Sequence, residues 1–220
     1  MGAAAVGPVV IAALFVAKGG CYFGLNGVDP WDEKRDARLY KGPHPVVAHP
    51  PCERWGRYWF GSPVGKVRHE RGSDGGCFES ALRSVRFHGG VIEHPEASYA
   101  WTKFRLNKPP KSGGWVPAGD FLGWTCCVEQ GHYGHRARKA TWLYVVGVVD
   151  LPELVWGPSA ATAHIAQMSA ARRSVRRSIP VEHLSHKERA ATPLPFRDLL
   201  IGLARRASPP DNPYAAWGLL

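Results

Sequence analysis

A cysteine stands directly behind two prolines, at a point where an apolar segment of the chain ends. The segment reads PVVAHPPCERWG, from Pro45 to Gly56. Proline has no amide donor and fixes its own φ, so Pro50 and Pro51 end strand pairing and stiffen the backbone that carries Cys52. A thiol becomes a nucleophile when it is partly exposed and has positive charge nearby, which Arg54 supplies in the sequence. The pattern indicates a nucleophilic cysteine at the rim of a sheet, with an inert loop cysteine as the alternative.

A second polar cluster follows another apolar run further along the chain. The run GGVIE ends at Glu93 and is followed directly by His94 and a proline. Where neighbouring strands run parallel, their carboxyl ends meet at one edge of the sheet, and ligands collect there. We therefore expect Glu93 to lie close to His49 and Cys52, with its carboxyl group serving in acid or base chemistry.

The elements that must position these groups form an α/β layer. Short, near-continuous apolar and β-branched runs, bounded by glycine, proline or charge, predict strands that are covered on both faces. Between them, CFESALRSVRFHGG is typical of a helix that stops at Gly-Gly. The alternation of strands and helices favours a mostly parallel sheet. The predicted strands are Val9–Val16, Pro45–His49, Gly89–Glu93, Leu122–Glu129 and Thr141–Val149.

The charge balance favours a polyanionic partner. Lys and Arg total 28 against 18 Asp and Glu among 220 residues, a formal net charge of +10. This surplus is typical of proteins that bind DNA, RNA or nucleotides, although a merely soluble basic protein has the same composition. Five cysteines in no repeating pattern argue against a disulfide framework and for a reducing, cytoplasmic location. The apolar run that begins at Pro8 is too short to span a bilayer, and no ligand spacing typical of a metal site occurs.

Three segments, in this order, resemble the DNA cytosine-C5 methyltransferase family of phage and bacterial type. PVVAHPPCERWG is similar to the Pro-Pro-Cys segment of that family, GGVIEHPEA to its Glu-Asn-Val segment, and GWTCCVEQGHYGHRARKATWLYVVGV to its Gln-x-Arg-x-Arg segment with the flanking strands. Upstream, ALFVAKGGCYFGL resembles the Phe-x-Gly-x-Gly cofactor loop, and VDPWDEKRDARLY resembles the acidic segment after it. The resemblance covers Ala13 to Gly147. It implies a trimmed, mostly parallel Rossmann-like methyltransferase sheet with a helical C-terminal segment.

The resemblance also implies roles for particular residues of this chain. Cys52 would add to C6 of a pyrimidine, Glu93 would act as the acid near N3, and either Arg136 or Arg138 would hold the base carbonyl or a phosphate. As an acid, Glu93 needs a raised pKa or must hydrogen-bond the base as a carboxylic acid. S-adenosyl-L-methionine would be the methyl donor. The residues expected at this cofactor are Phe15, Gly19, Gly20, Asp32 with Asp29 as its rival, and Pro50; those expected at the substrate, DNA or a pyrimidine nucleotide, are His49, Pro51, Arg54, Trp55, His94 and His135.

Some of these positions have a second interpretation. Asp32 precedes EKRDARLY and is equally suited to cap the N-terminus of a helix. Trp55, Tyr58 and Trp59 would stack on bases, or else they pack in the core or in a loop.

The chain departs from the family pattern at several points. Ala17 and Lys18 stand where the cofactor loop has a glycine, and His94 replaces the asparagine after the glutamate. We also expect no separate target-recognition domain. These departures leave two alternatives open: the same Cys52 adduct serves to modify an already modified phage pyrimidine without S-adenosylmethionine, or the protein binds DNA and has no catalytic activity.

The predicted organisation is a catalytic core over residues 1–157 and a basic helical segment over residues 158–220 that packs back on it. FRDLLIGLARRA has the spacing of an amphipathic helix. Thr162 to Ser178 also looks helical, and the tail from about residue 208 is expected to be mobile. The predicted helix over Thr162 to Ser178 carries a basic face made of Arg172, Arg173, Arg176 and Arg177.

Overall fold

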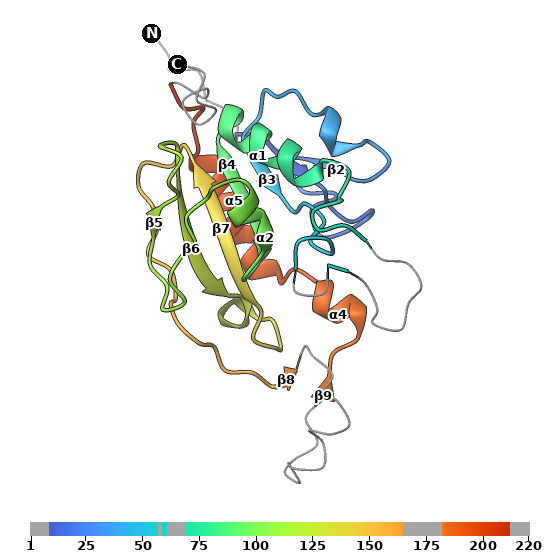
Figure 1. The fold of residues 1–220 in the computed structure, drawn as a ribbon. Helices are drawn as coiled ribbons and strands as arrows, with labels where there is room; N and C mark the ends of the chain where they lie inside the picture. Colours follow the sequence, from blue (N-terminus) through green and yellow to red (C-terminus); the bar gives the residue numbers. More distant parts are fainter. Residues whose placement is uncertain (1–8, 57–58, 61–68, 165–181, 212–220) are drawn as a thin grey trace.

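The structure is a computed structural model that describes residues 9–56, 59–60, 69–164 and 182–211. In these ranges a seven-stranded sheet, of order β2-β1-β3-β4-β7-β6-β5, runs through the centre of the molecule (Figure 1). Its strands are β1 (Ile11–Leu14), β2 (Val28–Trp31), β3 (Val46–Ala48), β4 (Gly90–Pro95), β5 (Val116–Pro117), β6 (Gly123–Glu129) and β7 (Ala140–Val146).

The sheet is mostly parallel. β1 pairs in parallel with β2 and β3, and β3 pairs in parallel with β4. β7 is antiparallel to β4 and to β6, and β5 is antiparallel to β6. It follows that β1 to β4 and β6 point one way, whereas β5 and β7 point the other. The predicted mixed α/β fold with a mostly parallel sheet is therefore confirmed.

The order of the strands reverses between β1 and β3. From β1 the chain first adds β2 on one side and then adds β3 and β4 on the other side. In open α/β sheets, such a reversal leaves a crevice at the carboxyl ends of the strands, and ligands bind there. In this sheet, the residues that follow β1 and β3 stand at that point.

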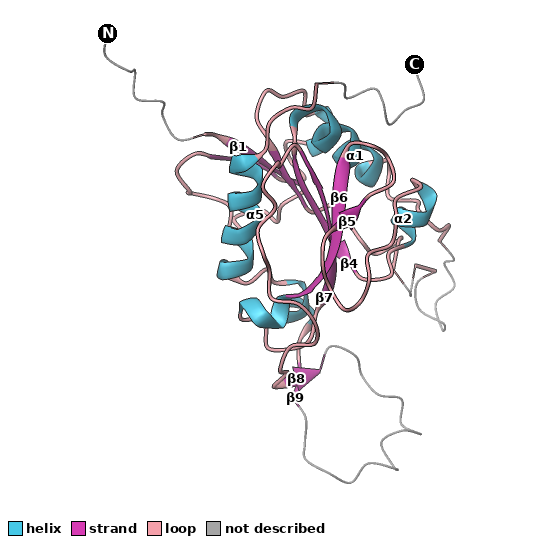
Figure 2. Cartoon of the chain, turned by 90° about the vertical axis from the view of Figure 1, so that its left-hand side faces the viewer, coloured by secondary structure: helices cyan, strands magenta, loops and turns pink. Residues whose placement is uncertain are grey.

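Helices cover both faces of the sheet, so two hydrophobic cores form. The core on one face includes Phe78 and Leu82 of α1 (Cys77–His88), and the core on the other face includes Phe196 and Leu200 of α5 (Leu194–Arg206). Figure 2 shows the sheet edge-on, with α5 on one side and α1 and α2 (Tyr99–Lys103) on the other. Because side chains alternate along a strand, each central strand contributes to both cores.

The C-terminal segment agrees with the sequence prediction in part. The amphipathic helix over Phe196–Ala207 is found as α5, and a shorter helix, α4 (His186–Ala190), precedes it. Two short parallel strands, β8 (Ala163–His164) and β9 (Glu182–His183), stand near α4. Most of the predicted helix over Thr162 to Ser178, with its four arginines, and the tail beyond residue 211 lie outside the described residues.

Candidate active site

Cys52 is held at the carboxyl end of β3 by a turn that starts where the strand stops. The amide of His49 still donates to the carbonyl of Leu14, at 3.0 Å, but the two prolines that follow have no amide to donate. The carbonyl of Cys52 then accepts from the amides of Trp55 and Gly56, each at 3.0 Å. The thiol is half-buried, so packing does not seal it.

Glu93 lies on the neighbouring strand, at the centre of a chain of hydrogen bonds. His49 Nδ1 lies 2.9 Å from Glu93 Oε2, and Gln130 Nε2 donates to Glu93 Oε1 at 3.1 Å. The hydroxyl of Tyr22 lies 2.8 Å from His49 Nε2. Gln130 also donates to the hydroxyl of Thr141, at 3.0 Å. Tyr22, His49, Glu93, Gln130 and Thr141, hereafter the polar relay, thus join segments that are far apart in the sequence.

The polar relay fixes one arrangement of protons. Burial raises the pKa of Tyr22 well above its ordinary value, so its hydroxyl stays protonated and donates to His49 Nε2. In either charge state, His49 can carry a proton on Nδ1 and donate it to the carboxylate of Glu93. The relay therefore orients an ionised carboxylate at the strand end.

The charges at this edge show that the thiol, the carboxylate and a lysine lie near one another. Burial raises the pKa of Cys52, the charge of Glu93 raises it further, and the charge of Lys139 opposes both effects. Burial lowers the pKa of Lys139, whereas Glu93 and Cys52 act in the other direction. Cys52, Glu93 and Lys139 thus lie within electrostatic range of one another at this edge of the sheet.

The protonation state of Glu93 differs from the expectation. Burial by itself would raise its pKa, but the hydrogen bond and charge of His49, together with Lys139, outweigh burial, and the pKa lies below its ordinary value of 4.5. The sequence analysis required a raised pKa or a protonated carboxyl group. In the structure the resting site instead holds a neutral thiol beside an ionised carboxylate.

The two arginines expected at the site are not shown to reach the polar relay. Both are exposed. Arg136 Nη1 lies 3.5 Å from Glu188 Oε1, and Arg138 Nε donates to the carbonyl of Ser159 at 2.8 Å. Lys139, whose ammonium group donates to the carbonyl of Ala191 at 3.2 Å, is the cation whose charge acts on Glu93 and Cys52.

Three residues predicted to contact substrate are instead buried in the protein. His94 is 1% exposed and its ring stacks on Trp101, because Glu93 and His94 point to opposite faces of β4. Trp55 is 4% exposed, packs on Phe78, and donates its indole N–H to Asp74 at 2.8 Å. His135 is also buried, and its Nδ1 is bonded within its own loop. His49, in contrast, lies in the site; Pro51 is exposed and Arg54 half-buried beside it.

The residues expected at a cofactor follow three strands: Phe15, Gly19 and Gly20 come after β1, Asp32 after β2 and Pro50 after β3. Phe15 has a left-handed φ of 58°, which costs energy for an aromatic residue and is typical of functional turns. Gly20 N donates to the carbonyl of Ala17, and a Cβ on Gly20 would lie 2.9 Å from that oxygen. Gly19 has a φ of 62°, and Pro50 is buried.

The acidic residues at this edge are already engaged. Asp29 accepts hydrogen bonds from Arg35 and Trp31; these outweigh the effect of burial and lower its pKa. Asp32 is 8% exposed, and its Oδ1 accepts from the amide of Arg35 at 3.2 Å within a turn. The alternative prediction of a helix N-cap at Asp32 is wrong, because the next helix, the 3-10 helix η1 (Ala37–Leu39), is capped by Asp36. Neither carboxylate is therefore presented openly to ribose hydroxyls. The present conformation does not complete a site for S-adenosylmethionine, and no step derived below passes through that donor.

Four residues of the site were missed by the sequence analysis: Tyr22, Gln130, Lys139 and Thr141. The alternation of side chains along a strand could have located Lys139. Thr141 is buried in β7, and Lys139 precedes it by two positions, so in extended chain the two side chains face the same side. Tyr22 and Gln130 lie in irregular segments, Gln130 at the start of the 3-10 helix η2 (Gln130–Tyr133). No periodicity reveals the contacts of such segments.

Within the ranges that the structure describes, no three His, Cys, Asp or Glu side chains gather as metal ligands. Among the described helices, none is long and apolar enough to span a membrane. No protein-family model matches the sequence, and no curated protein matches it either.

Proposed function

We propose that this protein modifies C5 of a pyrimidine in DNA through a covalent bond between Cys52 Sγ and ring C6, most simply as a cytosine-C5 methyltransferase. The observation that carries the proposal is the pairing of Cys52 with Glu93 at the carboxyl ends of adjacent strands, beside the point where strand order reverses. The mostly parallel sheet and the net charge of +10 support the same conclusion.

The resting pair of Cys52 and Glu93 holds one proton, on the thiol, and this is the proton that adduct formation requires at N3. Cys52 enters as a neutral thiol and Glu93 as a carboxylate. When the S–C6 bond forms, the thiol loses its proton, the ring C5=C6 electron pair moves toward C5, and N3 takes up a proton. Glu93 receives the thiol proton and donates it to N3, and it ends as a carboxylate again. His49 and Gln130 hold the carboxylate in place throughout.

The activated C5 then attacks an electrophile. The C5 proton is lost to a base from solvent, the sulfur leaves as a thiolate, and the proton on N3 returns through Glu93 to that thiolate. The aromatic ring, the neutral thiol and the carboxylate are then all restored. Lys139 stabilises the thiolate that leaves, because its charge lies near both Cys52 and Glu93. In duplex DNA the base must first leave the stack, which costs a few kcal/mol.

Exchange of the C5 hydrogen tests the adduct without any methyl donor. A DNA strand incubated with the protein in deuterated water should gain deuterium at cytosine C5, as measured by mass spectrometry of its nucleosides. We expect the rate to fall only at acidic pH, because a protonated Glu93 cannot take up the thiol proton and the pKa of Glu93 lies below its ordinary value of 4.5. Cys52→Ser should abolish exchange, and Glu93→Gln should slow it by about 100-fold or more.

Cys77→Ser is the matched control, since Cys77 is another half-buried thiol and belongs to α1. It should exchange at the wild-type rate. Absence of exchange in the wild-type protein, on both single-stranded and duplex DNA, would refute the covalent mechanism and leave a DNA-binding protein without catalytic activity.

A second candidate keeps the Cys52 adduct but uses no S-adenosylmethionine. Two observations favour it: Asp29 is paired with Arg35, and Asp32 is buried, so neither carboxylate is open to the ribose hydroxyls of S-adenosylmethionine. In this version the adduct assists replacement of a C5 substituent on an already modified pyrimidine. Isothermal calorimetry decides between the two, because micromolar binding of S-adenosylmethionine would exclude this candidate.

The proposal includes a reducing, cytoplasmic location in a bacterial or phage-infected cell. All five cysteines are free thiols in the structure, which supports it.

A further inference from the structure

A cavity of about 530 Å³ opens beside the turn that carries Cys52. Backbone hydrogen bonds tie its walls to that turn: Trp55 N donates to Cys52 O, Tyr99 N to Trp55 O, and Gly72 N to Arg54 O. A Cβ on Gly72 would lie 2.8 Å from the Trp55 ring, so glycine lets the loop lie flat on the indole. The cavity and the thiol therefore belong to one locally connected structure. It is lined by Trp55, Trp59, Glu70, Arg71, Gly72, Ser73, Tyr99 and Lys103.

Inside this cavity, the guanidinium group of Arg71 stacks against two aromatic rings, those of Trp59 and Tyr99. The guanidinium carbon of Arg71 lies 4.9 Å from the centroid of the Trp59 ring and 4.5 Å from that of Tyr99. Tyr99 remains 37% exposed, and Lys103 lies one helical turn further along α2. Arginine stacked on a ring keeps its N–H edge available for a phosphate.

The lining favours a nucleotide over a simple anion. Glu70 lines the same cavity and repels an isolated anion. A nucleobase has no net charge, stacks on exposed aromatic rings, and places its phosphate several ångströms away, where Arg71 and Lys103 can meet it. Insertion of a base between side chains requires an unstacked strand, as in single-stranded DNA.

We propose that this cavity binds the nucleotide next to the target pyrimidine in a DNA strand, with the base against Trp59 and Tyr99 and the phosphate at Arg71 and Lys103. The identification of the neighbouring nucleotide rests on the proposed function, because it takes Cys52 as the position of the target base. The cavity then supplies a contact outside the catalytic pair. It links catalysis to the sequence beside the target.

Fluorescence of a labelled single-stranded DNA dodecamer with one central cytosine tests the assignment. Trp59→Leu and Arg71→Gln should each weaken binding by about tenfold, the range measured for stacked bases in single-strand binding. 2-Aminopurine placed directly beside the cytosine, on the 5′ or the 3′ side, should be quenched by wild-type protein and not by Trp59→Leu. An abasic site at the same position should remove the effect of Trp59→Leu on affinity.

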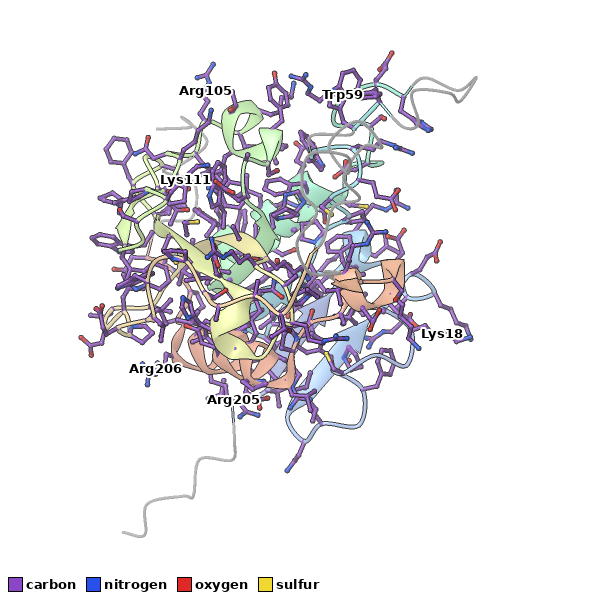
Figure 3. The ribbon with its side chains drawn as sticks, turned by 90° about the horizontal axis from the view of Figure 1, so that it is seen from below. Lys18, Trp59, Arg105, Lys111, Arg205 and Arg206 are labelled. Atoms are coloured by element: carbon purple, nitrogen blue, oxygen red, sulfur yellow. The ribbon has the colours of Figure 1, made fainter. Side chains whose placement is uncertain are left out.

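Two controls separate the cavity from general aromatic and charge effects. Phe121 is 96% exposed and lies before β6, so Phe121→Leu matches Trp59→Leu as the loss of an exposed aromatic ring. Arg206→Gln matches Arg71→Gln as the loss of one charge, and Arg206 lies on the opposite side of the molecule from Trp59 (Figure 3). Both controls should bind the strand within about twofold of wild type. Thermal melting of each variant shows that it is folded.

The proposal is overturned if Trp59→Leu and Arg71→Gln, both folded, bind like wild type, or if 2-aminopurine is quenched at neither position. Equal affinity for an RNA strand of the same sequence would overturn the assignment to DNA. Binding that depends on Trp59 without C5 exchange would refute the proposed function but support the cavity as a nucleotide site, whereas exchange without such dependence would do the reverse.

Discussion

Glu93 and His94 are adjacent in sequence and have opposite environments. Glu93 lies on the α5 side of β4, in the polar relay, and is ionised because His49 donates to it. His94 points to the α1 side, where Phe78 and Trp101 surround its ring and Ser98 Oγ lies 2.7 Å from Nδ1. Burial lowers the pKa of His94 from 6.5 to about 4. Both residues were expected at the site, His94 because it stands where the family has an asparagine after the glutamate, but a strand separates neighbours onto opposite faces.

The buried His94 should make the protein sensitive to acid. In the unfolded chain His94 takes up a proton below pH 6.5, whereas in the folded protein it stays neutral until about pH 4. The unfolded state therefore binds more protons in this window, and stability falls as the pH drops, by about 3 kcal/mol in total. His94→Gln should flatten the pH dependence of the urea midpoint between pH 7 and pH 4.5. An unchanged slope in that variant would contradict the assignment; above pH 7, where His94 is neutral in both states, the variant should show no altered slope.

Helices and strands could be predicted from the sequence where a local pattern of apolar residues determines them. Apolar runs locate β1, β3, β4, β6 and β7, and the carboxyl ends of β3 and β4 correctly join Cys52 to Glu93. β2 was not predicted, because it contains Pro30 and proline is rare within strands. The sheet accommodates this proline because β2 is an edge strand. Of the partners of Glu93, His49 was expected, because it ends the strand next to β4. Gln130, 37 residues away in sequence, was not, because no local pattern encodes such a pair.

A buried ion pair ties helix α1 to the antiparallel half of the sheet. The side chains of Arg86, in α1, and Asp120, before β6, are each about 5% exposed, and Arg86 Nη2 lies 3.0 Å from Asp120 Oδ2. The hydroxyl of Tyr144, in β7, donates to the same carboxylate oxygen. Asp120→Ala leaves the charge of Arg86 buried beside an empty space. Urea denaturation should show a loss of about 3–5 kcal/mol.

Two further variants test this interpretation of the ion pair. The double variant Arg86→Met with Asp120→Leu removes both charges and should recover much of the stability that Asp120→Ala loses. Lys111→Ala is the exposed counterpart: Lys111 is paired with Glu96 but is 84% exposed, and its loss should leave the urea midpoint close to that of the wild type. Equal effects of Asp120→Ala and Lys111→Ala would show that burial of the pair does not decide its contribution.

At the scale of the whole molecule, the C-terminal helix is part of the core that lies beneath the catalytic pair. Phe196, Leu200 and Leu203 of α5 share one hydrophobic core with alternate residues of β1, β3 and β4. Tyr22 belongs to the same core and donates to His49. Residues beyond 157 are therefore integral to the fold that positions the site.

Removal of this layer should abolish folding. A chain that ends at Gly157 exposes the α5 face of the sheet, and we expect no cooperative unfolding transition by circular dichroism.

In the full chain, Leu200→Ala should lower the free energy of unfolding by about 2–5 kcal/mol, because Leu200 is fully buried. Leu194→Ala, on the same helix but 56% exposed, should cost less than about 1 kcal/mol. A shortened chain that unfolds cooperatively and still exchanges the C5 hydrogen would show instead that residues 1–157 form an independent catalytic domain.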